Sequence, residues 1–293
     1  MSQPQSAPAA KASITFVFLV VLIDMLGFGI IMPVLPELIT EITGDSLSAA
    51  AVDAGWLAFA YAAMQFVFGP IVGNLSDRFG RRPVLLAALG GYAIAYILMG
   101  FAASLLWLFV ARIVAGIMGA SFSTAYAYIA DVSSPERRSQ NFGLIGAAFG
   151  LGFIFGPAIG GLLGEYGTRL PFFAAGGLAA TNLIFGFFML RESLPVEKRR
   201  PFEMKRANAL VALQGLSGQN RVVIWYAAAL TVWMIAHVVY PIVFAFYAIE
   251  NFGWSAFKVG LALACVGIGA ALVQGLLIRI LIPKIGERNA VII

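Results

Sequence analysis

The chain has 293 residues, of which 61% are hydrophobic and only 11% are charged, and its mean hydropathy is +0.91. A soluble domain carries about 25% charged residues, so this composition excludes a globular protein with a charged, water-facing surface. The one cysteine, Cys265, excludes an internal disulfide and a cysteine-based metal cluster.

Eight apolar segments of membrane length follow one another along the chain. The hydrocarbon core of a bilayer needs about 20 apolar residues per helix. Segments that are hydrophobic all round, with Gly and Pro inside them, are typical of helices packed against other helices in lipid. The first segment is too long for the core of a cleavable signal peptide. The sequence predicts an all-α integral membrane protein with spans near residues 14–36, 54–76, 83–103, 105–129, 141–164, 169–190, 221–249 and 256–282.

The positions of Lys and Arg predict the orientation of these spans. With the N-terminus in the cytoplasm, all but three of the 19 Lys and Arg residues fall in cytoplasmic segments. The exceptions are Arg169 and Lys258, in outer loops, and Arg112, within a span. Positive residues stay on the cytoplasmic side of short loops. We therefore expect a multi-pass protein of the inner (plasma) membrane with a cytoplasmic N-terminus, and the basic excess requires no nucleic-acid partner.

The first span contains a carboxylate, Asp24. A carboxylate inside a membrane is costly and is by default a functional hypothesis. A buried Asp24 would be able to gain and lose a proton. The alternative is a structural hydrogen-bond anchor beside a broken region at Gly27, Gly29 and Pro33. Residues 24–36 resemble the first helix of tetracycline and related drug exporters, which favours the functional role.

Residues 73–83 join the second and third spans and read Gly-Asn-Leu-Ser-Asp-Arg-Phe-Gly-Arg-Arg-Pro. Gly80 is free to adopt a positive φ in a tight turn, and Pro83 suits the first turn of the next helix. A plain positive-inside loop is the alternative. The segment resembles, without a gap, the loop motif between the second and third helices of major facilitator superfamily transporters.

That resemblance implies a latch that closes the cytoplasmic side of the molecule. It also implies that Arg81 pairs with Asp131, which ends the fourth span. The residues implied in this cytoplasmic gate are Gly73, Asp77, Arg78, Gly80, Arg81, Arg82 and Asp131.

The fourth span contains Arg112, followed by Gly116 and Gly119, and resembles the fourth-helix motif of the superfamily. The Arg of that motif is linked to proton coupling. Arg112 lies at a similar depth to Asp24 when the helix rise is counted. Because a buried Arg needs a carboxylate, we expect these two residues to pair if their helices are neighbours.

The fifth span carries glycines at every fourth position, on one helical face. Such ladders of small residues let helix backbones approach closely, and packing alone would explain them. The added Pro157 and the double glycine resemble the fifth-helix motif of the antiporters of the superfamily. The residues of this expected antiporter motif are Gly152, Gly156, Pro157, Gly160 and Gly161.

A polar, basic stretch at residues 191–220 divides the chain. Gly286 and Arg288 recur after the eighth span at the spacing of Gly80 and Arg82 after the second, which indicates two repeated halves. The resemblance implies the major facilitator fold. The expected domains are a six-helix bundle (1–190), a cytoplasmic linker (191–220) and a partial second bundle of two helices and the start of a third (221–293), so we expect a C-terminally truncated chain.

Further polar residues lie inside the spans, among them Gln65 and His237. His237 is the only histidine and would titrate near neutral pH, although a lone helix histidine is more often a packing residue. The residues predicted to couple protons or contact substrate are Asp24, Arg112, Gln65 and His237.

The resemblance to the tetracycline exporters covers nearly the whole chain, with two departures. Ala95 stands where those exporters carry an Asp, and Ala270 stands where they carry a His. Tetracycline is therefore a doubtful substrate. No Gly-rich ATP-binding run occurs in the sequence, and we expect neither an enzyme nor a cofactor or metal.

The resemblance implies a proton-coupled antiporter that exports a hydrophobic small molecule or drug by alternating access. Its expected partners are that molecule, protons and the lipid bilayer. Two alternatives remain: a metabolite or sugar transporter of the same fold, and a non-transporting fragment.

Overall fold

The computed structural model describes residues 7–134, 137–204, 207–211 and 220–273, and in this part of the chain every regular element is a helix. The prediction of an all-α protein is confirmed. The elements are α1 (Ala7–Ile31), α2 (Leu35–Thr43), α3 (Leu47–Phe79), α4 (Arg81–Gly100), α5 (Leu105–Gly119), α6 (Phe122–Val132), α7 (Arg138–Gly164), α8 (Leu170–Met189), the 3-10 turn η1 (Val196–Lys198), α10 (Arg221–Phe252) and α11 (Ala256–Leu272).

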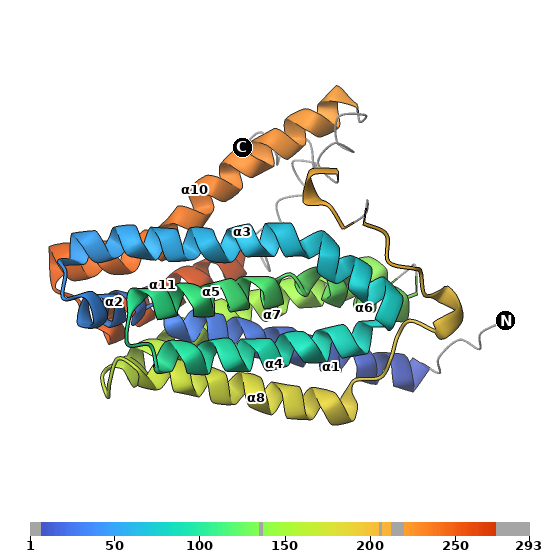
Figure 1. The fold of residues 1–293 in the computed structure, drawn as a ribbon, viewed down its shortest axis with the longest axis horizontal. Coiled ribbons are helices and arrows are strands. Elements are labelled where there is room, and N and C mark those ends of the chain that lie inside the picture. Colours follow the sequence, from blue (N-terminus) through green and yellow to red (C-terminus); the bar gives the residue numbers. More distant parts are fainter. Residues whose placement is uncertain (1–6, 135–136, 205–206, 212–219, 274–293) are drawn as a thin grey trace.

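Helices α1, α3, α4, α5, α7 and α8 run along the long axis of one bundle (Figure 1). Helix α1 begins at one end of this bundle, and α2 lies at the other. Two serines begin helices at the α2 end: the hydroxyl of Ser46 accepts a bond from the Ala49 N–H at 3.3 Å, and that of Ser104 accepts one from the Trp107 N–H at 3.4 Å. Such caps satisfy backbone N–H groups that have no partner in the first turn.

Among the described residues, five helices are long and apolar enough to cross a membrane, or six if α1 and α2 form one broken span. α5 and α6 together make the span Leu105–Val132. The seventh and eighth predicted spans correspond to α10 and α11, which are described as shorter apolar stretches. The predicted division at residue 190 falls between α8 and α10 and stays a prediction.

The bend between α1 and α2 measures 49°. It lies at residues 32–34, because α1 continues as a regular helix through Gly27 and Gly29 to Ile31. Of the expected broken region at Gly27, Gly29 and Pro33, only the part at Pro33 is present. Pro33 lies inside the bend, where its missing N–H removes a helix hydrogen bond.

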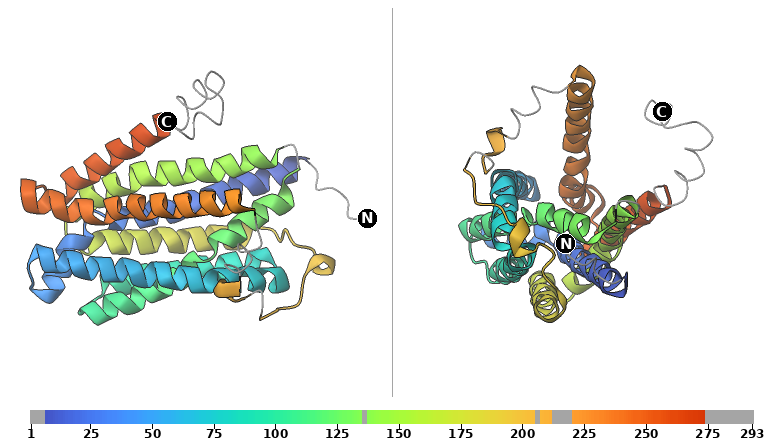
Figure 2. Two further views of the ribbon diagram at one scale, coloured as in Figure 1. Left: turned by 90° about the horizontal axis from the view of Figure 1, so that it is seen from above. Right: turned by 90° about the vertical axis from the view of Figure 1, so that its right-hand side faces the viewer.

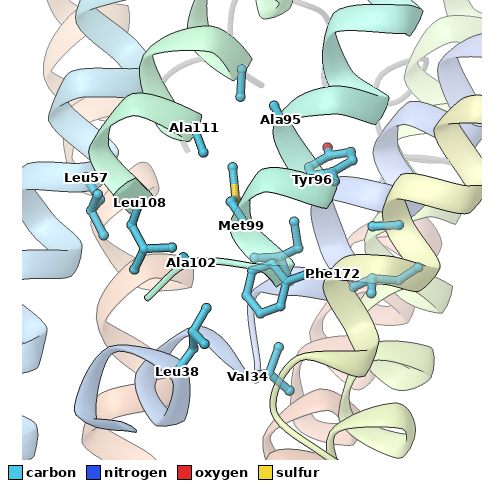
Figure 3. Close-up of a cluster of buried hydrophobic side chains, with 14 of the residues drawn as sticks. Val34, Leu38, Leu57, Ala95, Tyr96, Met99, Ala102, Leu108, Ala111 and Phe172 are labelled. Carbon is cyan, nitrogen blue, oxygen red and sulfur yellow. The ribbon is translucent and has the colours of Figure 1, made fainter. Parts of the chain in front are cut away.

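The main core cluster lies where α2, α3, α4, α5 and α8 meet (Figure 3). Small residues bring these helices close together: Ala95 of α4 and Ala111 of α5 are both fully buried and both belong to this cluster. Leu57 and Phe172 fill the space around them. The side chain at position 95 is therefore part of a closely packed helix–helix contact.

Helices α10 and α11 lie against the six-helix bundle on one side. Phe246 of α10 and Ala256 of α11 join the main core cluster. From there α10 diverges from α3 towards the end of the bundle where α1 begins (Figures 1 and 2). The two segments therefore contact each other closely near α2 and separate towards the opposite end.

Candidate functional site

The carboxylate of Asp24 lies on α1, half-buried inside the bundle. The amide Nδ2 of Asn182, on α8, donates to the carbonyl of Val20 at 3.0 Å and to Asp24 Oδ1 at 3.5 Å. Asn182 is fully buried. Its amide therefore fixes the position of Asp24 and gives this carboxylate one weak hydrogen bond.

Three tyrosines lie beside Asp24, on α3 and α4. The hydroxyls of Tyr61 and Tyr92 are 3.4 Å apart, and the rings of Tyr92 and Tyr96 stack with centroids 5.8 Å apart. Gln65 Nε2 donates to the Tyr61 hydroxyl at 3.5 Å and to the carbonyl of Gly119 at 3.1 Å. We call Tyr61, Tyr92 and Tyr96 the tyrosine layer.

Glycines on both sides let helices approach this layer. A Cβ on Gly27 of α1 would lie 3.2 Å from Cε2 of Tyr96. A Cβ on Gly119 of α5 would lie 2.8 Å from the Tyr61 hydroxyl and 2.9 Å from the Tyr92 hydroxyl. A larger side chain at Gly119 would displace these hydroxyls.

Arg112 lies on α5, seven residues before Gly119 and four before Gly116, so the three residues share one helix face. A Cβ at Gly116 would collide with the backbone carbonyl of Tyr61, so this face packs closely against α3. The guanidinium is half-buried. Within the described part of the chain, Arg112 forms neither an ion pair nor a hydrogen bond.

The expected ion pair between Asp24 and Arg112 is absent, since no oxygen of Asp24 lies within 4.0 Å of an Arg112 nitrogen. Both residues instead interact electrostatically with Tyr61 and Tyr96. The tyrosine layer therefore lies near both charges. Although Asp24 and Arg112 were expected at a similar depth along their helices, this does not bring their side chains within ion-pair distance.

The gate residues gather at the opposite end of the bundle from α2. Arg81 is 8% exposed. Its guanidinium lies 2.6 Å from Asp77 Oδ1 and 3.2 Å from Asp131 Oδ2, and it donates to the hydroxyl of Ser76 at 2.6 Å. The Arg81–Asp131 pair implied by the resemblance is thus present.

Glu192 was not identified from the sequence, although it organises this end of the molecule. Its carboxylate accepts bonds from the backbone N–H of Arg81 at 2.8 Å and of Arg82 at 3.3 Å, the first two residues of α4. Gly80, with φ of 104°, turns the chain there, and a Cβ at Gly80 would collide with the Glu192 carboxylate. The predicted positive φ of Gly80 is confirmed. The only sequence signal for Glu192 was an acidic residue at the start of a basic stretch.

The segment after α8 forms further hydrogen bonds with the gate residues. The backbone N–H of Arg200 donates to the Asp77 carbonyl at 3.0 Å, and the Ser193 hydroxyl donates to Asp131 Oδ2 at 3.1 Å. A pocket of about 550 Å³ lies between this segment and the gate. It is lined by Asp77, Arg81, Asp131, Leu194, Lys198 and Arg200.

The other predicted gate residues lie around this cluster. Arg78 lies over the ring of Phe79, 5.1 Å from its centroid. Arg82 donates to the carbonyl of Phe187 at 2.7 Å and lies over its ring. Gly73 faces α6, where a Cβ would be 3.7 Å from the Ser123 hydroxyl.

The glycines of α7 lie between α1 and α11. A Cβ on Gly152, Gly156 or Gly160 would collide with residues 25–30 of α1. On the other side, a Cβ on Gly161 would collide with the backbone of Ala256, at the start of α11, and one on Gly260 would collide with the carbonyl of Pro157. Every residue of the predicted antiporter motif therefore lies in these two close helix contacts.

The predicted site residues do not form one cluster. Asp24, Gln65 and Arg112 lie around the tyrosine layer, whereas the gate residues lie at one end of the bundle. Helix α10 passes through His237, but its side chain lies outside the described residues, as do Gly286 and Arg288. Among the described residues, no group of three His, Cys, Asp or Glu side chains is placed to hold a metal ion.

Comparison with known proteins places this architecture in a family. The sequence profile of the Major Facilitator Superfamily matches residues 17–293. The class C tetracycline resistance protein of Escherichia coli is 42% identical over 93% of this chain and 68% of its own length. The class H protein of Pasteurella multocida is 32% identical over 96% of this chain and 70% of its own length. The chain thus spans about two thirds of the length of these relatives.

A solved transporter structure is also similar to this chain. The crystal structure of the human organic anion transporter MFSD10 (TETRAN) superposes with a TM-score of 0.71 and 27% identity, over 91% of this chain and 72% of that one. With its apolar helices and these transporter relatives, the chain is a multi-pass membrane protein that belongs to the major facilitator superfamily and is related to the tetracycline resistance proteins.

Proposed function

We propose that this chain is a proton-coupled antiporter that exports a hydrophobic, drug-like molecule by alternating access. The observation that carries the proposal is the half-buried Asp24 carboxylate, which has one weak hydrogen bond and no counter-ion within the described residues. An ionised carboxylate without a partner is costly inside a membrane. Asp24 is therefore suited to bind a proton and to release it when substrate arrives.

Proton binding changes the balance between two conformations. A ligand shifts an equilibrium only when it binds one state better than the other. Protonated Asp24 is neutral and is stable in a closed, dry site, whereas the ionised form favours a state open to water or to a cationic group. Proton binding at Asp24 is thus able to select which side of the molecule is open.

The two helix contacts of α7, with α1 and with α11, are the surfaces at which we expect movement. α1 carries Asp24 and packs on the glycines of α7, and α11 packs on the opposite face of the same helix. Contacts built from small residues leave few interlocking side chains to obstruct a rotation. A movement of α1 would therefore be transmitted through α7 to the segment that holds α10 and α11.

The gate residues suit the closing of the cytoplasmic side. In this structure α10 diverges from α3 towards the gate end (Figure 2), an arrangement that supports an inward-open state with the predicted orientation. Closure would bring the second bundle against Asp77, whose side chain is 36% exposed. The ion pairs of Arg81 hold this carboxylate in position.

The relatives' names indicate the substrate class. Two of the relatives described above are tetracycline resistance proteins, which supports export of a drug. Position 95 is a fully buried alanine in a helix contact, so the polar group of the tetracycline exporters is missing there. We therefore propose a hydrophobic drug-like substrate other than the tetracyclines.

The test measures drug accumulation in a bacterial host that lacks its own efflux pumps. The chain, its Asp24→Asn variant and a matched Asp45→Asn variant are expressed at equal levels; Asp45 is exposed and outside the site. We expect the unmodified chain and Asp45→Asn to lower the accumulation of at least one fluorescent drug. A proton uncoupler should abolish the effect, and Asp24→Asn should lack it.

Other outcomes would overturn the proposal. Export that persists in Asp24→Asn, or in the presence of the uncoupler, would exclude proton exchange at this residue. Increased uptake of a sugar or metabolite would favour an importer. No effect on any compound would favour a non-transporting fragment.

A further inference from the structure

A hydrogen bond joins α7 to α11 at the end of the molecule where α2 lies. Glu165 directly follows α7, and its Oε1 accepts from the backbone N–H of Phe257 at 3.3 Å. Phe257 is the second residue of α11. The bond therefore connects the first six-helix bundle with the segment that holds α10 and α11.

Helix α11 has no cap from its own sequence. Ser255 precedes the helix, but its side chain forms no capping hydrogen bond, and the first turn contains no acidic residue. The N–H groups of a first turn need an acceptor from outside the helix. A carboxylate is favourable there, because the start of a helix carries a partial positive charge. Glu165 supplies this acceptor from a different helix.

The position of Glu165 is unfavourable for α7 itself. The residue is the C-cap of α7, and the end of a helix carries a partial negative charge that disfavours an anion. A second carboxylate, that of Glu37 on α2, interacts electrostatically with Glu165. Its own helix and Glu37 thus both oppose the charge of Glu165, whereas the start of α11 stabilises it.

The two helices approach closely around this bond. A Cβ on Gly161 would lie 2.5 Å from the carbonyl oxygen of Ala256, and a Cβ on Gly164 would lie 3.1 Å from the Ala256 Cβ. Ala256 is only 2% exposed. At the gate end, by contrast, α10 diverges from the bundle (Figure 2). The two segments are therefore held together at the α2 end, which is the outer side in the predicted orientation.

We propose that Glu165 is a positioning residue that keeps the outer side of the transporter closed by capping α11. The inference rests on the proposed alternating access and names a residue that biases it. Opening of the outer side would move α11 away from α7, so the Phe257 N–H would lose its acceptor and Glu165 would remain beside Glu37. A bond that forms in only one of two states shifts the population towards that state.

The first measurement follows the accessibility of a cysteine at this contact. Ala256→Cys is introduced into a Cys265→Ser chain, which removes the single native cysteine, and the purified full chain in lipid nanodiscs reacts with a water-soluble maleimide. We expect Glu165→Gln to raise the alkylation rate about fivefold, since a helix cap is worth about that factor. Glu250→Gln, which removes an exposed carboxylate on α10, is the matched control and should leave the rate unchanged.

A second reporter covers the case in which Ala256→Cys disturbs the packing. Val34 is fully buried, and its Cγ1 would lie 2.5 Å from a Cβ on Gly164. Val34→Cys places a smaller side chain on the first-bundle side of the same contact. The same increase in alkylation is expected there. Elution as a single symmetric peak in size-exclusion chromatography identifies the reporter chains that are folded.

The second measurement separates a shift between two states from a general loss of stability. Spin labels are attached at Glu197→Cys in η1 and Val222→Cys in α10, two exposed positions, in the Cys265→Ser chain. In alternating access, opening of the outer side closes the inner side. Glu165→Gln should therefore increase the share of short distances in double electron–electron resonance. A substitution that only loosens the packing would broaden the distances without shortening them.

The outcomes separate this inference from the function on which it rests. Equal alkylation rates in Glu165→Gln and Glu250→Gln, or inner-side distances that do not shorten in Glu165→Gln, would overturn the inference. Uncoupler-sensitive drug export together with such unchanged rates would leave the antiporter function standing without this role for Glu165. Faster alkylation and shorter inner-side distances in a chain that exports no drug would support the role of Glu165 and contradict the transport proposal.

Discussion

The two polar regions of this molecule differ in how their charges are satisfied. At the gate, Arg81 contacts two carboxylates and a hydroxyl, and Glu192 accepts from two backbone N–H groups at the start of α4. In the tyrosine layer region, Asp24 has one weak bond and Arg112 has none among the described residues. The gate charges are held in one geometry, whereas the interior charges have few partners among the described residues.

The largest effect is expected where a buried charge loses its pairs. Arg81→Gln removes the buried guanidinium that bonds Asp77 and Asp131, two partly exposed carboxylates, and the loss of hydrogen bonds to charged groups costs about 1.5–3 kcal/mol. We expect the free energy of unfolding, measured by SDS titration in mixed micelles, to fall by about that amount. Arg78→Gln is the control, because Arg78 only lies over the Phe79 ring. If the free energy of unfolding fell equally in the two variants, the bonds of Arg81 would not contribute specifically to stability.

A second prediction concerns the contact between α1 and α7. Gly160→Ala puts a methyl group where the Ile30 carbonyl lies, whereas Gly150→Ala on the same helix meets open space. Overpacking costs about 1–3 kcal/mol. The Gly160 variant should unfold at lower SDS concentration, and the Gly150 variant should match or exceed the original chain. If both variants behave alike, the close approach of α1 to α7 is contradicted.

A smaller loss of stability is expected for a substitution at Glu192. Glu192→Gln removes the negative charge at the start of α4, and such helix caps are worth about 0.5–2 kcal/mol. Stability should fall by about 1 kcal/mol. Glu197→Gln, in the exposed turn η1, is expected to leave it unchanged. If the Glu192 variant were as stable as the Glu197 variant, Glu192 would have no stabilising role at the gate.

A similarly small loss of stability is expected for a substitution at Asn182. Asn182→Ala removes the donor to Val20 and Asp24, and a hydrogen bond contributes about 1 kcal/mol net. Thr181→Ala, at the exposed neighbouring position, serves as control. Drug export should fall more in the Asn182 variant than its stability does, since Asp24 loses its positioning group. Export that falls only in proportion to stability would assign Asn182 a purely structural role.

Much of the fold follows from sequence because apolar length and helix signals are local. The turn at Gly80 and the helix segments that contain Asp24 and Arg112 were predicted in this way. The second span was placed at 54–76, however, while α3 begins at Leu47. The helix extends beyond its apolar part to the cap at Ser46, and hydropathy does not reveal such an extension.

The contacts of the site were harder to predict. Depth along a helix follows from residue counting, but the rotation of each helix about its axis depends on tertiary packing. For this reason Asp24 and Arg112 were expected to pair, and the tyrosine layer between their helices was not foreseen. Glu192 contacts residues more than 100 positions earlier in the chain, and a single sequence carries no sign of such a contact.

The proposed exchange of a proton for substrate at Asp24 is measurable in a weakly buffered detergent solution. A fluorescent drug whose accumulation the chain lowers is added to the purified chain at a series of pH values, and the released protons are followed with a pH indicator, with Asp24→Asn and Asp45→Asn in parallel. We predict that the original chain and Asp45→Asn release protons on binding, up to one for each bound molecule, and that Asp24→Asn releases none. Binding without proton release at any pH, or equal release from the Asp24 variant, would contradict the role assigned to this carboxylate.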